Sequence, residues 1–126
     1  MTNVNNVTLE VNTDAALTLA NAASTTINGT ETFQAAPSRR GDSLVLLIRN
    51  GAGDQGALTY SIAPGDFWAA TDALTGAVAQ GVTKAINIEG AKYRSKTGAF
   101  AITLTPATGK SLATNHAAAV GLIELP

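Results

Sequence analysis

Apolar and polar residues alternate with a period of two along much of this sequence, and this pattern constrains the fold more than any other feature. In one stretch, hydroxyl residues separate Leu58, Tyr60 and Ile62. Successive side chains of a β-strand point to opposite faces, so such a segment predicts a strand with one buried and one wet face. The same alternation occurs in residues 7–11, 86–89 and 99–105.

Two segments lack this alternation because they are apolar almost throughout. Residues 44–48 read Leu-Val-Leu-Leu-Ile, which predicts a central strand buried on both sides. Residues 117–125 form a second run of this kind, and Pro126 then removes a donor where a further ladder would have grown. We expect residues 44–48 to be the centre of the core.

Short connections between these segments contain the turn formers Gly, Pro and Asn. Strands at such spacing predict an all-β fold, a single antiparallel β-sandwich or a small β-barrel, with a polar N-terminal arm. The best candidates for helical turns are residues 14–23 and 65–73. The Ala-, Thr-, Ser- and Asn-rich residues 20–38 form a low-complexity segment whose pattern fits strand, arm or ordered loop equally.

Chain length and net charge further restrict the kind of protein that this sequence can encode. A chain of 126 residues predicts a single domain, residues 1–126, in which residues 1–13 form an arm or an edge strand. The net charge of −1, with charged residues at 13%, gives no general attraction to nucleic acid or to an anionic membrane. No segment has the composition of a signal peptide or a membrane span, so we expect a soluble chain made in the cytoplasm.

Catalytic and metal-binding patterns are not found, so we expect no enzyme, no cofactor and no metal. There is no Cys, His116 is the only histidine, and the nine carboxylates are scattered. The Gly-rich residues 50–56 carry a lone Asp54 without the acidic spacing of a calcium loop, so we interpret them as a turn. His116 is interpreted as an ordinary loop histidine.

Partner contacts are the remaining role for the unusual residues. Residues 92–96 place three cations around one aromatic ring, which predicts either a solvated strand end or a contact with a partner protein. Phe67 and Trp68 follow a Pro-Gly turn, where a Trp either plugs the core or anchors an interface. The candidate contact residues are Val4, Val7, Leu9, Arg39, Arg40, Phe67, Trp68, Tyr93 and Arg94.

The order of these segments resembles a known group of proteins. A Gly-Asp-Ser precedes an apolar strand that ends in Asn50-Gly51, a second strand ends in "SIAPGDF", and the chain closes with "AAAVGLIELP". Over residues 41–126 this layout resembles the small head decoration, or capsid auxiliary, proteins of tailed bacteriophages. In that family a glycine-rich or proline-containing approach often precedes a Tyr such as Tyr93, and residues 89–93 fit this pattern loosely, without the proline.

The resemblance implies a compact β-sandwich, immunoglobulin-like or jelly-roll-like, that binds the outer capsid surface. Its partner would be the major capsid protein, its location the virion, and its state a monomer, dimer or trimer. Its function would be to decorate or stabilise the shell. The alternatives are a neck, tail or fibre subunit, and an adhesion module that binds carbohydrate. The latter needs exposed aromatic residues, and the chain has one Trp and two Tyr.

Overall fold

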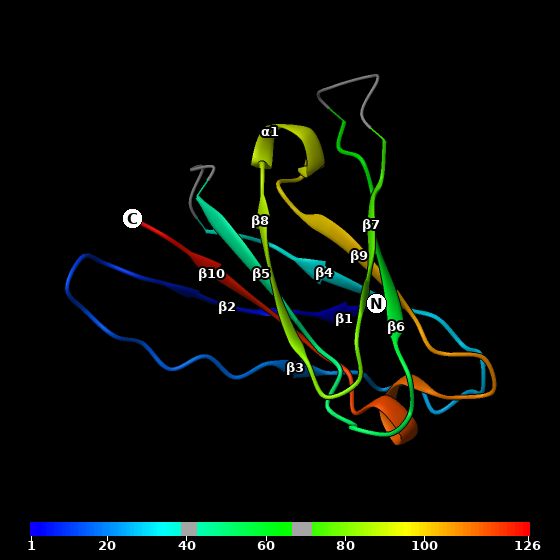
Figure 1. Cartoon of the computed structure of the whole chain (residues 1–126). Coiled ribbons are helices and arrows are strands. Elements are labelled where there is room, and N and C mark those ends of the chain that lie inside the picture. Colours follow the sequence, from blue (N-terminus) through cyan, green and yellow to red (C-terminus); the bar gives the residue numbers. More distant parts are fainter. Residues whose placement is uncertain (39–42, 67–71) are drawn as a thin grey trace.

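Two β-sheets face each other across one apolar core in the computed structural model, which describes residues 1–38, 43–66 and 72–126 (Figure 1). The predicted all-β class is confirmed. Sheet A has the order β1 (Thr2–Asn3), β4 (Glu31–Ala35), β9 (Phe100–Thr105), β6 (Leu58–Ile62), β7 (Leu74–Val78). Sheet B has the order β2 (Asn5–Thr8), β10 (Ala119–Glu124), β5 (Leu44–Arg49), β8 (Thr83–Ile88), and β3 (Ala20–Asn21) also pairs with β10.

Both sheets are mixed, so the prediction of a purely antiparallel fold is wrong. The N-terminal segment supplies the parallel pairs, β1 with β4 in sheet A and β2 with β10 in sheet B. All the other strand pairs are antiparallel. Within the described residues neither sheet closes on itself, which excludes the barrel alternative. Alternation fixes which face a residue occupies but carries no information on strand direction.

Inward-facing residues of the alternating strands form the core between the sheets. Phe33, Phe100 and Ile102 of sheet A are fully buried, as are Leu46 and Leu122 of sheet B. Strand β5 alternates between buried and half-buried residues, so the prediction that it is buried on both sides is wrong. Its second face is covered only in part, by the chain segment between β2 and β3.

Helical structure within the described residues is limited to two short turns. A single helical turn, α1 (Gly90–Tyr93), follows β8, and a π-helical turn (Leu112–His116) precedes β10. Residues 14–19, expected to be helical, have no regular structure and run into β3. Part of the other expected helix, residues 67–71, lies outside the described residues.

The N-terminal segment joins the two sheets. It pairs with β4 through β1, crosses at Val4, and pairs with β10 through β2. The Val4 N–H donates to the Gln34 carbonyl at 2.9 Å, and its side chain packs against the core. Residues 2–8 are therefore an edge strand of each sheet in turn.

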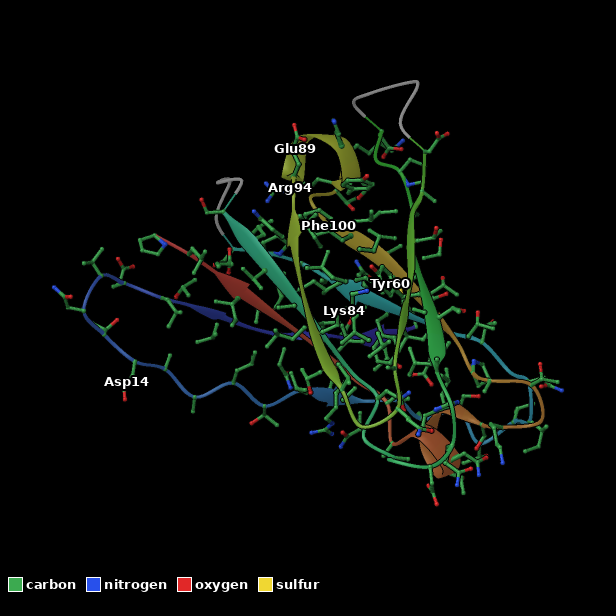
Figure 2. All side chains as sticks on the ribbon, in the orientation of Figure 1. Asp14, Tyr60, Lys84, Glu89, Arg94 and Phe100 are labelled. Atoms are coloured by element: carbon green, nitrogen blue, oxygen red, sulfur yellow. The ribbon has the colours of Figure 1, made fainter. Side chains whose placement is uncertain are left out.

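Strands β7 and β8 form the opposite margin of the molecule, one from each sheet (Figure 1). Lys84 spans this margin, because its Nζ donates to the Ala77 carbonyl at 3.1 Å and lies 5.7 Å from the centre of the Tyr60 ring (Figure 2). A lysine at an edge strand opposes the pairing of a foreign strand. The Lys84 charge therefore opposes the addition of a foreign strand at this open margin.

Candidate interaction surfaces

The outer face of sheet A is a regular array of hydroxyl and small side chains, here called the hydroxyl face. One row crosses four strands through Thr32, Thr103, Ser61 and Thr75, which are paired in register. The Thr32 and Thr103 hydroxyl oxygens lie 3.0 Å apart and share a hydrogen bond. The face consists of Thr32, Gln34, Thr59, Ser61, Thr75, Ala77, Ala101, Thr103 and Thr105.

None of the residues of the hydroxyl face is ionisable. A solvent-exposed surface usually mixes charges of both signs, which keep a protein soluble. Covering a face without charges requires no desolvation of an ion. The hydroxyl face is therefore suited to a lasting contact with an uncharged partner surface.

The outer face of sheet B is mainly apolar where β2, β10 and β5 lie side by side, and we call this part the apolar face. A row of paired residues, Val7, Ile123 and Val45, crosses β2, β10 and β5, and Leu47 extends it along β5. All four are half-buried. Antiparallel sheets that face water on one side usually carry polar residues there. This face is therefore available for packing by another chain segment.

Part of the apolar face is covered by the chain that follows β2. The methyl groups of Leu17 and Leu19 lie over Gly121 of β10, so closely that a Cβ there would overlap Leu19 Cδ2. The Asn5 amide donates to the Thr18 carbonyl at 2.8 Å and holds this segment against β2. Residues 17–19 therefore rest on the sheet instead of forming the predicted helix.

A groove of about 590 Å³ lies beside this covering segment. Its lining is apolar except for Thr18, Asn21 and Arg49, and the Arg49 Nη2 donates to Asn21 Oδ1 at 3.2 Å. Arg49 makes no ion pair with any carboxylate of the described residues. The lining residues are Leu17, Thr18, Leu19, Asn21, Leu47, Arg49 and Ile123.

Three of the candidate contact residues predicted from the sequence lie in the N-terminal segment. Val4 is partly buried against the core, Val7 belongs to the apolar face, and Leu9 is half-buried. The Leu9 N–H donates to the Glu124 carbonyl at 2.8 Å. Of the three, Val7 alone lies on one of the two faces described above.

Tyr93 and Arg94 lie at the end of α1, and both are half-buried. Tyr93 packs against the core, and the Arg94 guanidinium lies 5.7 Å from the centre of the Phe100 ring. Tyr93 also lines a depression of about 190 Å³ together with Met1 and Pro64. The structure thus brings the N-terminus and Tyr93 together. Arg39, Arg40, Phe67 and Trp68 lie outside the described residues.

His116 is a fully buried junction of three loops, not an ordinary loop residue. Its Nε2 accepts the Ala107 N–H at 3.0 Å, so its Nδ1 carries the proton and donates to Asn50 Oδ1 at 3.1 Å. The Asn50 amide in turn donates to the carbonyls of Gly56 and Val78. Burial, followed by the nearby Lys110 charge, lowers the pKa of His116. Residues 50–56 are accordingly a connection between β5 and β6 that these hydrogen bonds hold in place.

The sequence interpretation did not single out Leu17, Leu19, Arg49 or the hydroxyl row. A usable signal exists for the row, because Thr59-x-Ser61 and Thr103-x-Thr105 place hydroxyls on the wet face of two alternating strands. No such signal exists for Leu17 and Leu19, since their contact with Gly121 spans about a hundred residues of sequence.

Across the described residues no group of His, Cys, Asp and Glu side chains could hold a metal ion. The helical turns in the described ranges are too short to cross a membrane. No family model, curated protein or solved structure matches this chain.

Proposed function

We propose that this chain is a non-enzymatic structural protein of a tailed-bacteriophage virion. In this proposal its two sheets form one immunoglobulin-like or jelly-roll-like sandwich. It binds the outer surface of the assembled capsid, with the major capsid protein as its partner, and decorates or stabilises the shell. The observation that carries the proposal is the hydroxyl face, a surface without charges on a paired and hydrogen-bonded sheet.

The physical basis is the low cost of covering this face. Threonine and serine lose little rotamer entropy on burial, and their hydroxyls both donate and accept hydrogen bonds. A stable contact buries about 800 Å² on each partner, and repetition over a symmetric shell adds the contacts of many copies. A surface with weak individual contacts is sufficient when it is presented many times.

The alternatives differ in what they require of the surface. A neck, tail or fibre subunit would use the same hydroxyl face in a ring of fixed copy number. A carbohydrate-binding adhesion module requires exposed aromatic rings, and in the described residues every Phe and Tyr is buried or half-buried. The hydroxyl face therefore favours contact with a protein surface over contact with a sugar.

The test is cosedimentation with capsids of the corresponding phage that lack this protein, using mature and immature shells. We expect saturable binding to mature shells at many copies per particle. Ser61→Lys places a charge at the centre of the hydroxyl face and should weaken binding at least about tenfold, because an unpaired ammonium would be desolvated. Thr108→Lys, with the same charge change on an exposed turn, is the control and should bind normally.

Salt dependence provides a second readout. An interface without ion pairs should keep its affinity between about 0.05 and 0.5 M salt, since screening acts on charges. Equal binding by Ser61→Lys and the parent protein would exclude the hydroxyl face as the contact. Absence of binding to either shell would overturn the decoration role and leave the neck, tail and fibre alternatives.

A further inference from the structure

The loop between β2 and β3 contains an ordered turn at residues 10–14, which we call the tip. The Glu10 N–H donates to Thr13 Oγ1 at 3.2 Å, and the Thr13 hydroxyl and N–H donate to the Glu10 carbonyl at 2.8 and 3.3 Å. Asn12 completes the turn with φ of 61°, a left-handed conformation that Asn tolerates better than most residues. The tip is thus a closed, hydrogen-bonded turn.

This tip presents an apolar side chain and a carboxylate to solvent. Val11 is 71% exposed. Asp14 is exposed and makes no hydrogen bond or ion pair within the described residues. Figure 2 shows Asp14 on the N-terminal loop, pointing away from the two sheets. The pair therefore has no partner surface on its own molecule.

The groove on the apolar face has the complementary chemistry. Leu17, Leu47 and Ile123 supply an apolar wall, and Arg49 supplies a guanidinium that Asn21 orients. Arg49 is the only ionisable residue of the groove. A segment with one apolar side chain and one nearby carboxylate fits both features.

The tip of a molecule does not line its own groove, because neither Val11 nor Asp14 is among the groove residues. Leu17, the groove residue nearest to the tip in sequence, follows Asp14 by three residues (17 minus 14). Residues 17–19 rest on the sheet, and the loop between β2 and β3 extends beyond them (Figure 1). At roughly 3.3 Å per residue, Asp14 lies at most about 10 Å from the near end of its own groove. A second copy can bring its own tip to this groove.

We propose that copies of this chain associate head to tail, with the tip of one copy seated in the groove of the next. Val11 packs between Leu17 and Leu47, and the Asp14 carboxylate pairs with the Arg49 guanidinium. Such a heterologous contact generates a closed ring or an open chain, according to the rotation between copies. The contact is independent of the hydroxyl face and of any shell.

Charge reversal tests the contact by sedimentation equilibrium of the full chain from about 1 to 200 µM. The parent protein should self-associate to a greater extent as its concentration rises. Asp14→Arg and Arg49→Asp should each weaken association at least about tenfold, because each brings like charges together. An equimolar mixture of the two variants should restore it, since every contact then pairs Arg with Asp. Asp54→Arg, a reversal on an exposed turn, is the control and should associate like the parent.

The absence of cysteine allows a second measurement. Copies carrying Val11→Cys, mixed with copies carrying Leu47→Cys under mild oxidation, should form a disulfide-linked dimer of the two variants. Gly53→Cys, exposed in the loop between β5 and β6 and outside the tip, should not link to Leu47→Cys. A monomer at every concentration, or a charge-reversed mixture that does not recover, would overturn the contact. Shell binding by that monomer would leave the proposed function intact.

Discussion

The His116 imidazole is held in one tautomer by two hydrogen bonds that leave no room for a second proton. Protonation of Nε2 would set an N–H donor against the Ala107 N–H donor, 3.0 Å away. The charged ring would also be desolvated and lie near Lys110, and no described carboxylate compensates it. The neutral form is therefore part of the folded structure.

Stability should consequently fall on mild acidification. Because the folded pKa of His116 lies below the unfolded value near 6.5, the unfolded chain binds more protons between these two values. The free energy of unfolding is therefore undiminished above about pH 6.5, decreases as the pH falls through that value, and levels off below the folded pKa. Denaturant titrations of the parent protein from pH 8 to 5 measure this decrease.

His116→Gln is the matched control for this titration. Its side-chain carbonyl can still accept the Ala107 N–H, but it has no proton to gain in this range. The variant should be less stable at pH 8 and should show a flatter profile from pH 7 to 5. A parent profile as flat as that of the variant would contradict the neutral-histidine assignment. As the single histidine of the chain, His116 makes the comparison unambiguous.

At the scale of elements, a glycine on the outer face of strand β10 makes room for the chain segment that packs there. Gly121 lets Leu17 and Leu19 approach the strand, where any side chain would occupy their space. Gly121→Ala should displace residues 14–19 from the sheet while the inward-facing Val120 and Leu122 keep the core packed. Hydrogen exchange should then be faster in residues 14–21, with little change in β5 or β9.

Gly53→Ala is the control for this substitution, because a Cβ at Gly53 would meet no atom within 4 Å. It should leave the exchange of residues 14–21 unchanged. If Gly121→Ala also leaves that segment protected, the contact between Leu19 and β10 does not hold the segment in place.

The strands that the sequence predicts well are those in which apolar and polar residues alternate clearly. Strands β6 and β9 were predicted to within a residue or two, because Leu58 to Ile62 and Phe100 to Leu104 alternate without interruption. Strand β4 is hidden in the low-complexity segment and β7 was not predicted, since Gly76 and Ala77 give a weak pattern. The α1 and π-helical turns are too short for any periodic signal.

At the scale of the whole molecule, the N-terminal segment ties the sheets together. Thr2 donates to Glu31 at 2.6 Å on sheet A, and Asn6 donates to the buried Glu124 at 2.8 Å on sheet B. The same Glu31 accepts the N–H groups of Ala23 and Ser24. These residues therefore belong to the folded domain as edge strands and do not form a detached arm.

Deletion of residues 1–8 should accordingly lower the melting temperature of the isolated protein by at least about 5 °C, equivalent to a loss of one or two kcal/mol. The deletion removes both parallel ladders, the core contact of Val4 and one donor to Glu124. Differential scanning calorimetry measures the change. The variant that lacks only Met1 is the control, and an unchanged melting temperature for the longer deletion would show that the pairing contributes no stability.

The sequence by itself determined the all-β class, the inward-facing residues of β6, β8 and β9, and the low charge of the surface. These follow from local alternation and composition, which a single strand already expresses. Only the tertiary structure decided the parallel direction of β1 and β2, the buried state of His116, and the meeting of Leu19 with Gly121. Each of these depends on contacts between distant segments, and a pattern of nearest neighbours carries no record of them.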